Sequence, residues 1–354
     1  MADKSNIEWT EATWNPIVGC SIVSPGCSNC YAMKMARRIE AMQPGSHYAG
    51  TTQVVNGNAV WTGKVALAPE HILTQPLRWC RPRKIFVNSM GDLFHESVPD
   101  EWIDRVFAVM ALAPQHTFQV LTKRSARMRA YCSEVRETWC RSGSPISGSD
   151  RIHEAALSIT GKEWLEATPG QWPLPNVKLG VSAEDQRRAD ERVPDLLETP
   201  AAVRFVSAEP LLGPINFARI SPRTFAAYAN SLTGVWQWGG GPSRVETPGL
   251  DWIIGGGESG PSARPMHPDW VRAIRDQCAA ADVPFFFKQW GEWAPPSVLT
   301  YDTLTNCRLQ ARAEANPSLV HVFPDGLNMG RIGKRAAGRL LDGIEHNAMP
   351  EARR

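Results

Sequence analysis

Six short apolar segments, each ending at a polar residue, are the feature that most constrains how this chain folds. They are rich in β-branched and aromatic residues, which predicts strands, and helical patterns or long connections separate them. The predicted strands are residues 84–88, 117–121, 177–181, 203–206, 250–254 and 283–287. Helices are predicted from Asp100, from Ser125 and over residues 268–281. Alternating strands and helices are typical of a parallel sheet built from βα units.

Side chains that can take part in chemistry follow the predicted strands. They are Asp92, Lys123, Ser182 with Glu184, Glu209, Glu258 and Lys288. In β/α barrels the active site is formed by the residues just past the carboxyl ends of the strands. If residues 7–18 supply one more strand, the chain forms a partial or distorted (β/α) barrel of about six to seven βα units.

Long connections interrupt this pattern at residues 43–63, 140–176 and 213–249. The middle connection is rich in Ser, Gly and Pro, which is more typical of an insertion or lid than of a second domain. We therefore predict one barrel domain over residues 1–300 that carries these three insertions. Residues 301–354 are predicted to be a basic C-terminal extension packed on the barrel.

Composition excludes several classes of protein. Hydrophobic residues make up 43% of the chain and charged residues 21%, as in globular proteins that bury a core. No apolar segment approaches the ~20 residues of a membrane span, and the polar N-terminal segment differs from a signal peptide. We expect a cytoplasmic protein without membrane contact. The net charge of +2 argues against broad non-specific binding to nucleic acid, although basic residues cluster locally.

Three of the eight cysteines, Cys20, Cys27 and Cys30, have the spacing C-x6-C-x2-C. Glycines and a proline around them predict a loop, and a helical pattern follows Cys30. The N-terminus of a helix favours thiolates over thiols. Three thiolates in such a loop are well placed to bind a metal ion or an iron–sulfur cluster.

The cysteine spacing leaves three interpretations open. Buried thiols without a ligand are the simplest, but residues this rich in glycine make poor core. A structural zinc ion needs a fourth ligand, and the nearest residues that could supply one are His47 and Cys80. Three protein ligands with one open position suit catalytic zinc or a [4Fe–4S] cluster whose fourth iron binds a substrate or cofactor.

Two glycine-containing turns are further candidates for the site. Gly91 and Asp92 follow the strand at 84–88, where a close backbone and a carboxylate suit a ligand's ammonium group. An ordinary turn that caps the next helix is the alternative. Residues 255–258 (GGGE) follow a later strand, but glycine runs are weak evidence by themselves.

The other polar residues also have structural alternatives. Glu184, Glu209 and Glu258 would be costly to bury unpaired, so each is either a site residue or one partner of an ion pair. The candidate partners are Lys123, Arg124, Arg204, Arg264 and Lys288. Core packing is the leading interpretation for the tryptophans Trp14, Trp290 and Trp293, with stacking on a ligand as the alternative. His95 is the one histidine that the sequence places near the site.

Motifs along nearly the whole chain resemble those of the phage-associated three-Cys-motif proteins, which occur in phages, prophages and bacteria. These motifs are TWNPIVGC (13–20), GCSNCYA (26–32), SMGDLF (89–94), LTKR (121–124), GVSAEDQ (180–186), RFVSAEPLLGP (204–214), WIIGGGESGPSARP (252–265), FFKQWG (286–291) and KRAAGRLLDG (334–343). The family is in turn similar to radical S-adenosylmethionine proteins, with spore photoproduct lyase the nearest named relative in kind.

This resemblance implies a radical-SAM-like barrel with a [4Fe–4S] cluster on Cys20, Cys27 and Cys30. In radical S-adenosylmethionine enzymes the fourth iron chelates the methionine part of the cofactor. Their usual spacing is C-x3-C-x2-C with an aromatic residue before the last cysteine, whereas here the first gap is six residues and Tyr31 follows Cys30. The resemblance also implies a three-Cys-motif partner protein, and kinship favours nucleic acid as the substrate.

The leading hypothesis is an iron–sulfur enzyme that cleaves S-adenosylmethionine to a 5′-deoxyadenosyl radical, which abstracts hydrogen from nucleic acid for its modification or repair. The predicted cofactor-binding residues are Gly91 and Asp92, which hold the amino group, with Ser182, Glu184, Lys123 and Arg124. The predicted catalytic residues are Glu209, Glu258 and Lys288.

The competing hypothesis is a binding module of phage origin that performs no chemistry. In this hypothesis the three cysteines, together with Cys80 or a histidine, bind a structural zinc ion. A bound iron–sulfur cluster could serve the same structural purpose. Such a module would bind nucleic acid or another protein.

Overall fold

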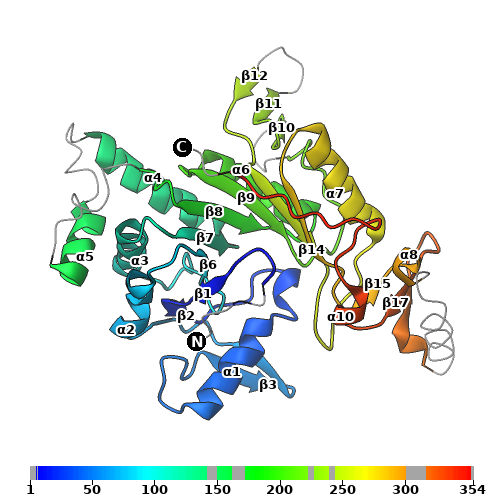
Figure 1. Cartoon of the computed structure of the whole chain (residues 1–354), viewed down its shortest axis with the longest axis horizontal. Helices are drawn as coiled ribbons and strands as arrows, with labels where there is room; N and C mark the ends of the chain where they lie inside the picture. The colour runs from blue at the N-terminus through cyan, green and yellow to red at the C-terminus, as the bar shows by residue number, and fades with distance from the viewer. Residues whose placement is uncertain are drawn as a thin grey trace. The chain divides into compact units, whose positions relative to one another are not determined.

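The computed structural model of the chain describes residues 5, 7–141, 150–161, 172–221, 227–238, 244–299 and 316–351. The fold is mixed α/β, and its main sheet has seven strands in the order β1-β6-β7-β8-β9-β13-β14 (Figure 1). These strands are β1 (Ala12–Trp14), β6 (Lys84–Val87), β7 (Thr117–Thr122), β8 (Val177–Ser182), β9 (Val203–Ala208), β13 (Trp252–Gly256) and β14 (Phe285–Gln289). All six strands predicted from the sequence are present, and β1 supplies the additional strand expected from residues 7–18.

The strand pairs β1–β6, β6–β7 and β7–β8 of this sheet are parallel. Ala12 pairs with Ile85, Lys84 with Thr117, and Phe118 with Val177. The strands β13 and β14 are parallel as well. Because β1 and β14 are the end strands of the order, the sheet is consistent with the predicted partial barrel.

The helices between these strands begin where the sequence predicted. The helix α3 (Asp100–Leu112) follows Pro99 and has two acidic residues in its first turn, which complements the helix dipole. The helix α4 (Ser125–Arg141) begins directly after β7. The helix α7 (Pro268–Ala280) begins after His267, whose ring accepts a hydrogen bond from the Asp269 N–H. A side-chain cap therefore marks the start of α7, and acidic residues in the first turn mark that of α3.

The chain divides into two compact units. The first comprises Met1–Val181, Asp195–Phe205 and Glu351–Arg354. Besides its sheet strands, α3 and α4, it contains β2 (Ile17–Val18), α1 (Tyr31–Met42), β3 (Thr52–Val55), β4 (Asn58–Trp61), β5 (Ala66–Leu67), α2 (Glu70–Leu73) and α5 (Asp150–Thr160). Two short 3-10 turns, Pro25–Cys27 and Gln75–Arg78, complete it.

Two of the predicted insertions lie in this first unit. Residues 43–63 contain the hairpin β3–β4, whose turn residues Asn56 and Gly57 both have positive φ, and this hairpin contacts α1. In the second insertion, 140–176, the helix α5 packs on α3 (Figure 1). Residues 142–149 and 162–171 of that insertion lie outside the described residues.

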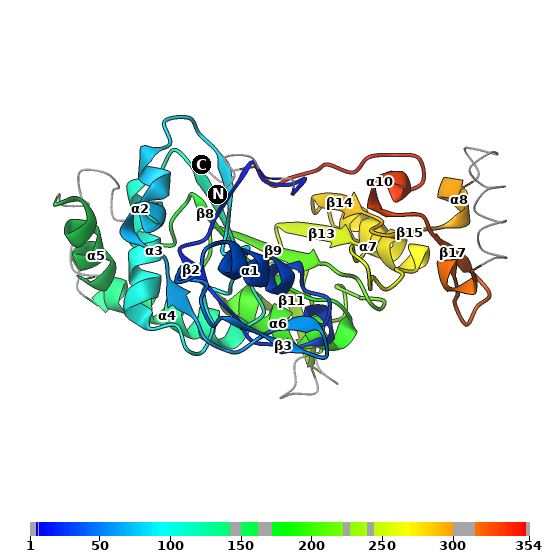
Figure 2. The same ribbon diagram turned by 90° about the horizontal axis from the view of Figure 1, so that it is seen from below.

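The second unit comprises Ser182–Pro194 and Val206–Pro350. Its helix α7 packs on β13 and β14 (Figure 2). Its other elements are α6 (Gln186–Glu198), β10 (Ala227–Asn230), β11 (Val235–Trp238), β12 (Arg244–Glu246), β15 (Trp293–Ala294), α8 (Pro296–Leu299), β16 (Val320–Val322), β17 (Asn328–Arg331), α10 (Lys334–Ala337) and the 3-10 turn Pro317–Leu319. The antiparallel strands β10–β12 occupy the predicted insertion 213–249, of which residues 222–226 and 239–243 lie outside the described residues.

The C-terminal part of the chain is tied to the body of the second unit. The strand β15 pairs with β17, so one small sheet joins segments on both sides of the predicted boundary at residue 300. That boundary itself lies outside the described residues. The tail then runs along β14, where the Phe287 N–H donates to the His346 carbonyl at 2.9 Å. This contact occupies backbone groups that an edge strand would otherwise leave unpaired.

None of the helices in the described parts of the chain combines the length and the apolar character that crossing a membrane requires.

The approach of Gly91 to the segment before Cys20 explains why a glycine occupies this position. Gly19 and Gly91 form an isolated parallel bridge, and the Gly19 N–H donates to the Met90 carbonyl at 3.1 Å. A Cβ atom on Gly91 would lie 2.9 Å from the Ile17 carbonyl oxygen and 3.1 Å from that of Gly19. This close approach is to the protein's own backbone, and it fixes the loop after β6 against the residues that lead into the cysteines.

We therefore expect Gly91→Ala to destabilise the protein by about 1–3 kcal/mol, because the added methyl group forces these backbone segments apart. Urea unfolding of the wild type and the variant measures this difference. Gly213→Ala is the control, since a Cβ there would lie 3.4 Å from the Asp185 Cβ, an ordinary van der Waals distance. Equal unfolding midpoints for the two variants would contradict the packing explanation.

Candidate functional site

The cysteine loop, residues 19–31, lies between β2 and α1 and is shaped by short backbone turns. Cys27 ends the 3-10 turn Pro25–Cys27, and its N–H donates to the Ser24 carbonyl at 2.9 Å. The Cys30 N–H donates to the Cys27 carbonyl at 3.2 Å, and Cys30 is the N-cap residue of α1. These turns bring the second and third cysteines to the start of the helix, as the sequence predicted.

The three thiols of this loop lie near one another. All three are free, with Cys27 buried and Cys20 and Cys30 partly exposed. Burial is the main cause that raises the pKa of Cys20 and of Cys30, and the Cys27 thiol raises the pKa of both further. Cys27 therefore lies close enough to the thiols on either side of it to influence both of them electrostatically.

Two asparagine side chains tie the cysteine loop to the loop after β6. The Asn15 Oδ1 atom accepts from the Met90 N–H at 2.9 Å and from the Ser89 hydroxyl at 3.1 Å. The Asn88 Oδ1 atom accepts from the Ile17 N–H at 3.2 Å, and the Asn88 backbone has φ 57°. Such left-handed backbone is commoner for Asn than for most residues. Together with the bridge between Gly19 and Gly91, these bonds fix the two loops as one structure.

Asp92 follows this second loop, and its carboxylate is fully occupied. The Oδ1 atom accepts from the Thr122 hydroxyl at 2.6 Å and from the Phe94 N–H at 3.1 Å. The Oδ2 atom accepts from the Lys123 N–H at 3.1 Å and from the Arg124 guanidinium at 3.0 Å. This geometry favours a role in holding Arg124 over the predicted binding of a cofactor's amino group.

Arg124 connects Asp92 to the cysteine loop. Its Nη1 atom donates to Cys20 Sγ at 3.3 Å, and its Nη2 atom donates to the Ser21 carbonyl at 3.1 Å and to Ser21 Oγ at 2.7 Å. Burial is the largest single effect on Arg124 and lowers its pKa, but Asp92, Cys20 and Glu96 together outweigh burial and hold that pKa above its ordinary value. The guanidinium is therefore a permanent positive charge beside Cys20.

His95 completes this network on the far side of Ser21. Its Nδ1 atom accepts from the Ser97 N–H at 3.1 Å, so Nε2 carries the proton and donates to Ser21 Oγ at 2.9 Å. Burial lowers the pKa of His95, and the charge of Arg124 lowers it further. His95 is thus neutral near pH 7. The sequence placed it near the site, and the structure shows that it orients Ser21.

Helix α1 and Lys123 supply further positive potential at Cys30. The N–H groups of Ala32 and Met33 lower the pKa of the Cys30 thiol, and the charge of Lys123 also lowers it. Burial nevertheless dominates and raises that pKa above its ordinary value. The sequence-based prediction that the helix N-terminus favours a thiolate identified a real effect, but burial outweighs it.

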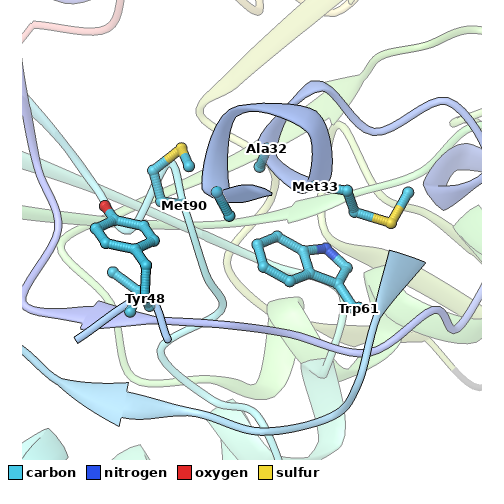
Figure 3. Close-up of a cluster of buried hydrophobic side chains, with 7 residues drawn as sticks. Ala32, Met33, Tyr48, Trp61 and Met90 are labelled. Carbon is cyan, nitrogen blue, oxygen red and sulfur yellow. The ribbon is translucent and has the colours of Figure 1, made fainter. Parts of the chain in front are cut away.

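An apolar cluster supports the cysteine loop from beneath. It comprises Val18, Ala32, Met33, Ala36, Tyr48, Trp61 and Met90, and Cys20 and Cys30 pack against it. Figure 3 shows these side chains gathered at the first turn of α1. The hairpin β3–β4, within an insertion that the sequence left without a role, contributes Trp61. This insertion therefore forms part of the floor of the loop.

In the second unit, the predicted residue Glu184 belongs to a buried ion pair with Arg192, which also contacts the backbone of Ser182. The Glu184 side chain is 0% exposed and its Oε2 atom lies 3.0 Å from the Arg192 guanidinium. Arg192 also donates to the Ser182 carbonyl at 2.7 Å. This geometry favours the structural alternative for Glu184, which the sequence had left open.

Glu258 has the partner that the sequence proposed. Its carboxylate accepts from Arg264 Nη2 at 2.5 Å, from Arg264 Nε at 2.9 Å and from the Arg264 N–H at 2.8 Å. Hydrogen bonding to Glu258 is the main cause that raises the pKa of Arg264. This bidentate pair fixes the turn after β13.

Glu209 and Lys288 form an ion pair of 2.5 Å at the ends of β9 and β14. Their side chains are 17% and 15% exposed. A Cβ atom on Gly255 would approach Val271 of α7, whereas one on Gly256 would approach Lys288 and Glu209. Because adjacent residues of a strand point to opposite faces, this pair lies on the face of β13 and β14 away from α7. The predicted catalytic role of both residues remains a prediction.

The three candidate tryptophans are core residues. Trp14, Trp290 and Trp293 are all buried. Their indole N–H groups donate to the carbonyls of Ile72 at 2.9 Å, Leu340 at 2.8 Å and Ala263 at 2.7 Å, respectively. These hydrogen bonds favour the packing interpretation over stacking on a ligand.

No group of three or more His, Cys, Asp and Glu side chains in the described parts of the chain is arranged to hold a metal ion. Those parts include Cys20, Cys27, Cys30 and the exposed Cys80. A single ion would need its sulfur ligands at about 2.3 Å from one centre. The thiols of the cysteine loop therefore do not form a site for a single ion.

Comparison with known proteins places the chain in a family. The family described as "Protein of unknown function (DUF5131)" matches residues 4–350. The chain belongs to this family. No curated protein and no solved structure matches it. The function must therefore be argued from the geometry of the cysteine loop and its surroundings.

Sequence reasoning missed three contributors to this site. It assigned no role to Ser21 or Asn15, and it predicted that Arg124 binds a cofactor rather than Cys20. Ser21 directly follows Cys20, and Asn15 lies five residues before Cys20. Their closeness in sequence to the proposed ligand Cys20 was the only signal that either residue belongs to the site. Their hydrogen-bond partners lie more than 70 residues away in the sequence.

The buried thiols lead to a prediction about their reactivity. Burial and the nearby Asp92 raise the pKa of Cys20 from 9.0 to about 12, so its thiolate population at pH 8 is roughly a thousandfold below that of an ordinary thiol. In protein freed of metal, we expect alkylation of Cys20 by iodoacetamide to keep accelerating up to about pH 11. The exposed Cys80 provides the comparison in the same sample. Mass spectrometry of the modified peptides measures both, and a plateau for Cys20 near pH 9 would refute the expected shift.

Proposed function

We propose that this protein is an iron–sulfur enzyme that uses S-adenosylmethionine, with a [4Fe–4S] cluster held by Cys20, Cys27 and Cys30. The observation that carries this proposal is the presence of three free cysteines, spaced C-x6-C-x2-C, in one loop after the first strands of a parallel βα fold. Three thiols leave one iron of such a cluster for a small-molecule ligand. The resemblance to radical S-adenosylmethionine proteins supports the choice of that ligand.

The surroundings of the thiols suit a cluster chemically. Thiolates on a cluster carry negative charge, and Arg124, Lys123 and the first N–H groups of α1 all supply positive potential. The apolar cluster beneath the loop excludes water from one side. Hydrogen bonds and a low dielectric around the sulfurs are the means by which proteins tune such groups.

The number of thiols in the cysteine loop supports iron–sulfur over structural zinc, because a structural zinc ion needs a fourth ligand whereas a [4Fe–4S] cluster can keep one iron open. Each thiolate of a [4Fe–4S] cluster binds a different iron, so the sulfurs need not converge on one point. The described residues contain no group arranged to hold a single metal ion. Cys80, the candidate fourth zinc ligand, is exposed. The zinc form of the binding-module alternative therefore has less support, whereas a module stabilised by an iron–sulfur cluster differs from the proposed enzyme only in lacking activity.

When bound, such a cluster would supply the electron that splits S-adenosylmethionine into methionine and a 5′-deoxyadenosyl radical. The chain's own part in that reaction is to hold the cluster and orient the cofactor. We propose that Lys123 and the loop at Gly91 border the cofactor, whereas Arg124 holds the cysteine loop. Nucleic acid as the substrate, and a partner protein, remain parts of the proposal that rest on the resemblance alone.

Purification without oxygen tests the cluster directly. We expect a brown protein with about four iron and four sulfide per chain and a visible absorption band that bleaches on reduction. Cys27→Ala should lose at least half of the iron, because it removes one of the three proposed ligands. Cys80→Ala is the matched control and should keep the full content, since Cys80 is exposed.

The alternatives give different outcomes in the same experiment. A colourless protein with one zinc per chain would refute the proposal in favour of the binding module. A cluster that survives in Cys27→Ala would refute the ligand assignment. A cluster that forms no 5′-deoxyadenosine from S-adenosylmethionine on reduction would refute the enzymatic part.

A further inference from the structure

The guanidinium of Arg124 is fixed from several sides at once. Its Nη1 atom donates to both Asp92 at 3.0 Å and Cys20 Sγ at 3.3 Å. Its Nη2 atom donates twice to Ser21, and its Nε atom lies 3.5 Å from Glu96 Oε1. Only 5% of the side chain is exposed. These contacts hold the guanidinium in a single orientation. In that orientation a charged N–H group of Arg124 points at Cys20 Sγ.

The groups behind Arg124 are arranged to keep it there. Each oxygen of Asp92 accepts two hydrogen bonds, so the carboxylate cannot turn away. Ser21 Oγ accepts from Arg124 and from His95, which uses both of its lone pairs. A buried ion pair is weak evidence for stability, because the cost of removing two charges from water offsets most of their attraction. Stability therefore does not explain why Arg124 also donates a hydrogen bond to Cys20 Sγ.

We propose that Arg124 is a positioning residue that holds Cys20 and makes the cluster bound there easier to reduce. This inference rests on the proposed function. An N–H donor and a positive charge next to a ligating sulfur stabilise the more negative, reduced form of an iron–sulfur cluster. Arg124 therefore acts through Cys20 and needs no contact with the cofactor or the substrate.

A redox titration of the anaerobically purified protein, followed by electron paramagnetic resonance, tests this role. For Arg124→Met we expect the reduction equilibrium to fall roughly tenfold, which is a shift of about 59 mV to more negative potential for one electron. Arg124→Lys should give an intermediate shift. It keeps the charge, but a single ammonium group cannot reproduce the fork that spans Asp92, Cys20 and Ser21.

A double variant separates the redox effect from folding. Arg124→Met alone leaves the Asp92 carboxylate buried without its charged partner, which is destabilising. Asp92→Asn with Arg124→Met removes both charges, so the shift that remains reports the lost N–H···S hydrogen bond. We expect this variant to keep its iron and still to be harder to reduce than the wild type. Iron content and thermal unfolding are measured on every variant.

Arg127→Met is the matched control, because Arg127 lies three residues further on, in helix α4, and pairs with Asp100 at 2.7 Å. Its reduction potential should equal that of the wild type. If all three Arg124 variants bind the cluster and titrate together with Arg127→Met, the inference is overturned while the proposed function stands. If the wild-type protein binds no cluster, both the proposed function and this inference are refuted.

Discussion

The buried contact between Asp92 and Arg124 is the interaction on which the candidate site depends. Asp92 follows the loop after β6 and Arg124 follows β7, so their pairing joins the ends of two neighbouring parallel strands. Arg124 then reaches Cys20 and Ser21 in the loop that follows the first strands. Three segments far apart in the sequence thus meet at one guanidinium, because the carboxyl ends of parallel strands lie at the same edge of a sheet.

The backbone beneath this contact leaves little freedom. Gly19 and Gly91 approach each other too closely for a side chain at position 91. Asn15 and Asn88 each accept a hydrogen bond from the backbone of the opposite loop, from Met90 and Ile17 respectively. The apolar cluster with Trp61 and Met33 fills the space below. The cysteines are consequently presented by a rigid frame, which is what a site that binds a metal cluster requires if its ligands are to be positioned before binding.

The ion pairs of the second unit indicate which of the predicted site residues have a structural role. Glu184 is fully buried against Arg192, and Glu258 is held by the Arg264 fork. The Glu209 side chain, paired with Lys288, is 17% exposed, compared with 0% for Glu184 and 6% for Glu258. Burial therefore distinguishes carboxylates that all follow strands in the same way. The sequence could not make this distinction, because each partner lies in a different element or turn.

The sequence by itself determined the strands, the starts of the helices and the clustering of the cysteines. These features depend on local alternation, capping and spacing, which act over a few residues. Only the tertiary structure decided that Arg124 bonds to Cys20, that residues 43–63 form a hairpin beneath the cysteine loop, and that burial raises the pKa of the cysteine thiols. These outcomes depend on contacts between distant segments and on exclusion of water. Neither is encoded in the spacing of residues along the chain.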